Sequence, residues 1–177
     1  MKKRALWVLL AAALALTVSA GSTVAYLVSR SVTLENTFTY GTVDISLKET
    51  SGAEYIMAPG VTLFKDPVVT VKGGSESCWL FVKIQKSANF DAFCSFELQD
   101  GWTEFSRSEG LYCRKVSGSS VDLGFHVLRN DRVSVKDSVT EEQLNGLSSY
   151  PTLDFTAYAI QSDGFDNAHD AWEALDQ

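Results

Sequence analysis

Apolar and polar residues alternate through residues 26–48, which indicates extended, half-buried backbone. Arg30 and Asn36 are the two interruptions on the apolar side, and the glycine at position 41 allows a bend. We therefore expect a first strand near residues 37–48, preceded by an extended arm over residues 26–36.

The same period of two recurs farther along, between glycine- and proline-containing turns. The segment 78–84 is apolar almost throughout, as a central strand would be. The expected later strands cover residues 67–71, 78–84, 93–99, 111–116, 121–128 and 153–161. Short strands at this spacing predict an all-β protein, an antiparallel β-sandwich spanning residues 37–177.

Two segments have helical signals instead. Thr140 and Gln143 have the spacing of a capping box, and the glycine at position 146 ends that helix early. Near the C-terminus the apolar residues follow the spacing of an amphipathic helix: Ala168, Ala171, Trp172 and Leu175. We expect one or two short peripheral helices, with Trp172 packed onto the sandwich.

The first 25 residues have the pattern of a secretory signal peptide. Basic residues at positions 2–4 precede an uncharged stretch over residues 5–20, and small residues follow it. Two cleavage sites fit, one after Ala25 and before Tyr26, the other after Ala20. An uncleaved membrane anchor is the alternative, since the apolar stretch is long enough to span a bilayer. We expect a secreted protein, located in the extracellular matrix or at the cell surface.

Composition and charge narrow the range of possible functions. The 177 residues are 45% hydrophobic and 21% charged, with a formal net charge of −7. No basic run follows the N-terminal one. Because nucleic-acid binding requires a cationic face, we exclude nucleic acid as a partner.

Candidate chemistry is sparse. The three cysteines, Cys78, Cys94 and Cys113, have no metal-ligand spacing, and their pairing is left open. His126 and His169 lie in no catalytic motif. We therefore predict no catalytic residue, no metal and no cofactor.

Two further features are candidates for ligand binding. The acidic stretch 162–170 lacks the spacing of a calcium loop and is interpreted as a turn followed by a helix. Trp102, which follows an Asp-Gly turn, is the aromatic residue most open to a ligand or partner contact.

The arm is the most informative segment. If it is free, it exposes an apolar face formed by Tyr26, Val28, Val32 and Leu34. Such a segment can add as a strand to a neighbouring molecule, and head-to-tail addition that does not close gives a filament. The alternatives are an arm folded onto its own domain and a flexible tail.

Short motifs, in order over nearly the whole chain, resemble those of the TasA/camelysin (CalY) family. The segments that carry the resemblance are Gly21–Tyr26, Asn36–Leu47, Pro59–Gly60, Lys65–Pro67, Asp100–Trp102, Gly110–Tyr112 and Ala157–Gln161, with Phe165 and Trp172 behind them. The chain departs from the family pattern at Cys113 and at Arg30.

The resemblance implies a jelly-roll sandwich that a SipW-type signal peptidase cuts after Ala25. It implies a fibre subunit of the biofilm matrix of a Gram-positive bacterium, polymerising with itself by donor-strand exchange, with other matrix proteins as further partners. A camelysin-type cell-surface metalloendopeptidase is one alternative, although no ligand set supports it. A monomeric surface ligand-binding or adhesin module is the other.

Overall fold

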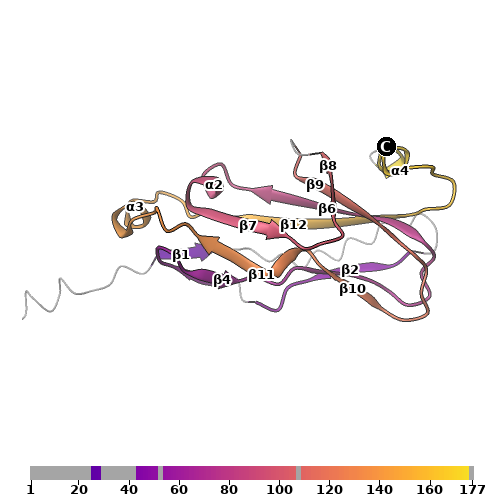
Figure 1. The fold of residues 1–177 in the computed structure, drawn as a ribbon, viewed down its shortest axis with the longest axis horizontal. Helices are drawn as coiled ribbons and strands as arrows, with labels where there is room; N and C mark the ends of the chain where they lie inside the picture. Colours follow the sequence, from indigo (N-terminus) through magenta and orange to yellow (C-terminus); the bar gives the residue numbers. More distant parts are fainter. Residues whose placement is uncertain (1–24, 29–42, 52–53, 107–108, 176–177) are drawn as a thin grey trace, which may run out of the picture.

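The computed structural model describes residues 25–28, 43–51, 54–106 and 109–175, which form antiparallel sheets and three short helices. The strands are β1 (Ala25–Val28), β2 (Ile45–Lys48), β3 (Glu54–Met57), β4 (Thr62–Phe64), β5 (Val68–Val71), β6 (Cys78–Lys86), β7 (Cys94–Leu98), β8 (Thr103–Ser106), β9 (Leu111–Val116), β10 (Leu123–His126), β11 (Leu128–Val135) and β12 (Leu153–Gln161). The helices are α2 (Phe90–Phe93), α3 (Glu141–Asn145) and α4 (Ala168–Leu175). The body is elongated, with α3 and α4 at opposite ends (Figure 1).

One layer is a four-stranded sheet in the order β12-β6-β9-β8. Strand β6 is central and mostly buried, as its continuous apolar run predicts. Leu80 and Val82 face the main core, whereas Phe81 faces a second, smaller cluster on the outer side of this sheet.

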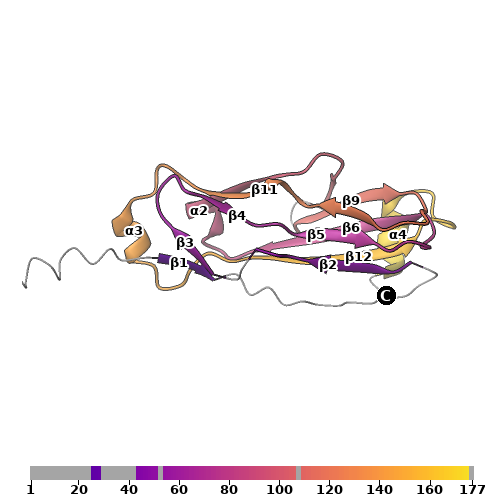
Figure 2. The ribbon, with the colours of Figure 1, turned by 90° about the horizontal axis from the view of Figure 1, so that it is seen from below.

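The second layer is built from two three-stranded sheets, β10-β5-β2 and β4-β11-β7. Strand β4 leads into β5, and β10 leads into β11. Two backbone hydrogen bonds join the sheets across these breaks: Lys65 N–H donates to the Asp131 carbonyl (2.8 Å), and Val127 N–H to the Pro67 carbonyl (2.9 Å). The main core contains buried residues of both layers, and Figure 2 shows the layers from another side.

The predicted C-terminal helix, α4, covers the outer face of the four-stranded sheet. Ala171 is fully buried there. The Trp172 ring lies 5.0 Å from that of Phe81 and 5.3 Å from that of Tyr158, measured between centroids. The prediction that Trp172 packs this helix onto the sandwich is confirmed.

The capping box of α3 is also confirmed. Gln143 N–H donates to Thr140 Oγ1 (3.2 Å), and Thr140 N–H donates to Gln143 Oε1 (2.9 Å). The expectation of one or two helices was wrong, because the described residues contain a third, α2. That helix has only four residues, too short for a helical period to be visible in the sequence.

Most predicted strands are present: β9 and β12 have the predicted bounds, β5 and β7 are shorter, and β6 extends two residues farther, to Lys86. Of the first expected strand, residues 45–48 form β2, and residues 37–42 lie outside the described part. The segment expected as one strand over 121–128 is divided at Val127 between β10 and β11. Four strands were not predicted from the sequence: β3, β4, β8 and most of β11.

A polar cluster lies beneath the start of β5. Lys65 is 1% exposed, and its ammonium lies 3.0 Å from Glu49 Oε2. Asp66 accepts hydrogen bonds from the Thr50 and Ser51 backbone N–H groups (2.9 and 2.7 Å). These bonds tie the segment after β2 to the segment before β5, so charged groups fix this junction.

Candidate functional site

The predicted signal-cleavage position and the start of the arm lie at β1. Ala25 opens the strand opposite Met57, Tyr26 is opposite Ile56, and Val28 is opposite Glu54. Strand β1 pairs with β3 in a separate two-stranded sheet near α3, outside both large layers (Figure 2). The alternative cleavage site, Ala20, and the arm residues Val32 and Leu34 lie outside the described residues.

The strand that receives β1 carries an exposed apolar residue. Ile56 of β3 is 58% exposed, whereas its neighbour Met57 is buried. Two more large apolar side chains are exposed just beyond it, Val61 and Phe64, the latter at 56%. Large apolar side chains that form one exposed patch are typical of an interaction surface.

Trp102, the aromatic residue expected to be most open to a ligand, is buried. It is 9% exposed, and its indole N–H donates to the His126 carbonyl (2.9 Å). The ring therefore packs in the core with its polar atom already bonded.

The cysteine pairing left open by the sequence is resolved as no pairing. Cys78, Cys94 and Cys113 are all free and buried. Burial raises the pKa of Cys78 and of Cys94 to about 11, and raises that of Cys113. The thiols therefore stay protonated at neutral pH and are poor nucleophiles or metal ligands.

The histidines are far apart in the chain, and each contacts a carboxylate. His126 Nδ1 lies 2.7 Å from Asp131 Oδ1, and His169 Nε2 lies 3.3 Å from Glu173 Oε1. Among the described residues, no three His, Cys, Asp or Glu side chains are grouped so as to hold a metal ion. In the same part of the chain, no helix is long and apolar enough to cross a bilayer.

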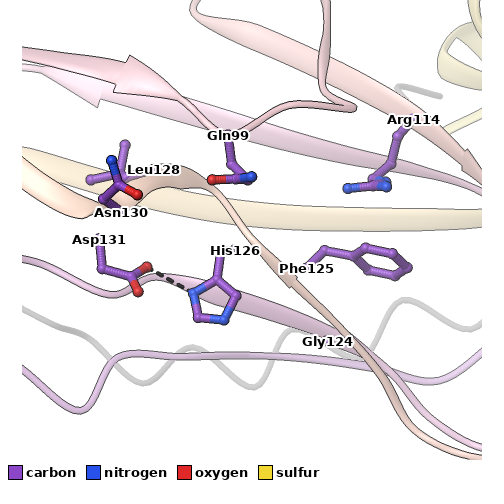
Figure 3. Close-up of a pocket in the computed structure, with 8 residues that line it drawn as sticks. All are labelled: Gln99, Arg114, Gly124, Phe125, His126, Leu128, Asn130 and Asp131. Atoms are coloured by element: carbon purple, nitrogen blue, oxygen red, sulfur yellow. Dashed lines mark hydrogen bonds and ion pairs between the residues drawn. The ribbon is translucent and has the colours of Figure 1, made fainter.

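A groove of about 360 Å³ opens at one side of the sandwich (Figure 3). It is bounded by β9 of one layer and by β10 and β11 of the other. Its lining residues are Gln99, Arg114, Gly124, Phe125, His126, Leu128, Asn130 and Asp131. This volume lies within the range of small-molecule sites.

Arg114 occupies an inward-facing position of β9. Its neighbours Tyr112 and Val116, two residues away on either side, pack in the main core, whereas Leu111 and Cys113 pack beneath α4. The alternation of the strand thus directs an arginine toward the interior, where an apolar residue is the rule.

The Arg114 guanidinium rests on aromatic rings. It lies 4.1 Å from the Phe125 centroid and 5.4 Å from that of Trp102. Its Nε is buried without a hydrogen-bond partner. Burial lowers the pKa of Arg114 from its usual value, although the group remains cationic at neutral pH.

The opposite wall is shaped by a bulge in β11. The register with β7 shifts between Leu128 and Val133. Asn130 and Asp131 have φ values of 54° and 55°, in the left-handed region that Asn and Asp tolerate best. The bulge presents Asp131 to His126, and Figure 3 shows this pair across the groove from Arg114.

Reasoning from the sequence missed this groove. The signal was present, because Tyr112, Arg114 and Val116 share one face of a predicted strand, and the arginine breaks its apolar pattern. The bulge left no such signal, since its polar residues are typical of a turn.

Comparisons with protein-family models, with curated proteins and with solved structures found no match for this chain. The resemblance to the TasA/camelysin family therefore rests on the short motifs alone and stays a prediction.

Proposed function

We propose that this protein is a non-enzymatic structural subunit of extracellular fibres, and that its N-terminal arm adds as a strand to a neighbouring copy. One observation carries the proposal: β1 pairs only with β3 among the described strands, in a two-stranded sheet apart from the two layers. An arm held in this way can be exchanged between copies without disturbing either layer.

The energetics favour exchange. Met57 anchors β3 in the main core, so β3 can stay in place while β1 leaves. The pairing of two short strands is marginally stable by itself, so release of β1 from β3 costs little. The same strand from a second copy, beginning at Tyr26 after cleavage, would re-form the pairing of residues 26–28 in the same register. Exchange of an identical element is a low-cost route to assembly, and an open head-to-tail arrangement extends into a filament.

The exposed apolar residues support the same proposal. Ile56 lies on the receiving strand itself, and Phe64 lies on β4, the next strand. Both side chains are exposed although β1 is already paired with β3, so the exchanged strand alone would leave them exposed. The body of the neighbouring copy would cover them and add apolar burial to the backbone pairing.

We also propose that the two layers form a jelly roll, which is a double sheet of eight strands. Counting β4–β5 and β10–β11 as continuous strands gives each layer four. Strand β2 pairs with β5 and also contacts β12 of the other layer, as an edge strand between two sheets does.

The cellular setting follows the sequence. We propose export through the signal at residues 1–25, cleavage after Ala25 by a SipW-type peptidase, and assembly with further copies in the biofilm matrix of a Gram-positive bacterium. The secreted product would then begin at Tyr26, which leaves the arm at a new terminus.

The experiment compares the chain starting at Tyr26 with one lacking residues 26–34, by electron microscopy and light scattering. We expect filaments only from the chain that keeps the arm. Equal assembly by both would remove the arm from the mechanism.

Two matched double variants test whether assembly depends on the apolar face of the arm or on its net charge. Val32→Asp with Leu34→Asp places charge on the apolar face, and Ser31→Asp with Thr33→Asp places the same charge on the polar face. The first pair should abolish filaments, and the second should leave them. Loss of filaments in both would point to net charge as the cause.

A further inference from the structure

The geometry of the groove points to a second site, separate from the arm. We propose that the groove around Arg114 binds a small, hydroxyl-rich molecule carrying one carboxylate, which is the chemistry of a sugar acid. The proposal does not depend on fibre assembly.

The carboxylate is inferred from the state of Arg114. Among the described residues, no carboxylate pairs with its guanidinium, and buried polar atoms without partners, such as its Nε, are rare in folded proteins. Arg129, in contrast, is paired with a carboxylate: its Nη2 lies 2.5 Å from Asp100 Oδ1. A desolvated, unpaired cation is stabilised when an anion arrives.

The shape of the guanidinium favours a carboxylate. Its central carbon lies over the rings of Phe125 and Trp102, so contacts on the aromatic side restrain the group before a ligand binds. A planar fork of N–H donors matches the two oxygens of a carboxylate and gives a bidentate contact. Little conformational entropy remains to be lost on binding.

The rest of the lining favours hydroxyl groups. Gln99 and Asn130 bring side-chain amides, which both donate and accept hydrogen bonds, and His126 brings an imidazole. These groups come from β10, β11 and the end of β7, opposite Arg114 (Figure 3). A ring with several hydroxyls would meet a partner on each side.

The groove favours a ligand with one negative charge over a ligand with several. Asp131 also lines the groove, and no lysine does. The formal net charge of −7 repels polyanions at a distance. A single carboxylate gains the contact with Arg114 and avoids most of this repulsion.

The test is calorimetric titration of the full chain with D-glucuronate, with D-glucose and inorganic phosphate as the neutral and non-sugar probes. We expect millimolar or tighter affinity for glucuronate, no heat with glucose, and weaker binding of phosphate. In two-dimensional NMR spectra, glucuronate should shift the Trp102 indole N–H signal, since that group lies beside the groove.

Two arginine variants give the matched comparison. Arg114→Met keeps an apolar stem over the rings and should weaken glucuronate binding about tenfold or more. Arg129→Met removes an arginine that is already paired and should bind as the parent chain does. If Arg114→Met fails to fold, Gln99→Ala replaces it, with weaker glucuronate binding expected from a chain that retains Arg114.

Three results would overturn the proposal: no glucuronate binding by the parent chain at millimolar concentration, equal binding of glucose, or unchanged affinity in a folded Arg114→Met chain. Tighter binding of phosphate than of glucuronate would contradict the sugar-acid chemistry. None of these outcomes bears on filament formation, so the two proposals can fail separately.

Discussion

The ion pair between Lys65 and Glu49 is unusual for its burial. The side chains are 1% and 8% exposed, and the Lys65 ammonium also lies 5.4 Å from the Phe155 ring centroid. Burial outweighs the attraction of Lys65 and raises the pKa of Glu49. Each charge therefore depends on the other for its stability in the interior.

Lys65→Met is expected to lower the free energy of unfolding by about 3 kcal/mol or more, because it leaves the Glu49 carboxylate buried without its cation. Adding Glu49→Gln should recover part of this loss. Chemical denaturation measures both. The control is Lys72→Met, whose partner Asp122 and whose own side chain are exposed, so its change should stay within about 0.5 kcal/mol.

Asp66 is expected to make the stability of the fold depend on pH in the acidic range. Burial alone would raise its pKa, but hydrogen bonds from Thr50 and Ser51 prevail and lower it from 3.8 to about 2. The stability that Asp66 contributes to the folded state is therefore present above pH 3.8 and is lost as the pH falls toward 2.

Between pH 4 and pH 2, we expect the free energy of unfolding to fall by about 2 kcal/mol more in the parent chain than in Asp66→Asn. Chemical denaturation midpoints measured across that pH range give this difference. Glu49, with its raised pKa, has the opposite dependence, since its contribution is present at low pH and is lost as the pH rises. Equal slopes in the two chains would show that Asp66 is not the group responsible.

At the scale of single elements, α3 offers the sharpest test. Thr140→Ala removes the side chain that caps its first turn and should cost about 1 kcal/mol of unfolding free energy. Ser138→Ala, at an exposed turn position two residues earlier, is the control and should change little. A cost shared by both variants would indicate a general effect of this loop.

The elements predicted from the sequence are those with a strong local signal. The apolar run of β6, the alternation of β12, the box that caps α3 and the apolar stripe of α4 all specify their conformation within a few residues. Burial in the fold then agrees with what the local pattern favours.

The missed elements depend on distant partners. The polar residues 129–132 have no strand pattern of their own and lie at the register shift of β11, a strand whose flanking residues pair with β4 and β7. Strand β8 is short and exposed in its first half, and β3 has four residues. The groove depends on the same non-local pairing, because Arg114 meets Phe125 only when two layers pack together.

At the scale of the whole molecule, the two layers and the N-terminal strand β1 are held in different ways. Backbone pairing holds each layer together and a shared core joins the two layers, whereas β1 has β3 as its partner strand among the described residues. Strand β1 lies toward the α3 end of the body (Figure 1), and the Arg114 groove lies between β9 of one layer and β10 and β11 of the other (Figure 3).

A disulfide placed in the register of β1 and β3 tests whether the strand comes from the same copy or from a neighbour. Val28 and Glu54 are opposite each other, and the Cα spacing of such antiparallel pairs, about 4.5–5.5 Å, suits a disulfide. The chain from Tyr26 with Val28→Cys and Glu54→Cys is assembled, oxidised and run on a non-reducing gel; the native thiols are buried, and each single variant is a control. We predict a ladder of covalent oligomers from the double variant and at most dimers from the single ones. A double variant that is entirely monomeric, with its disulfide closed within one chain, would contradict strand donation.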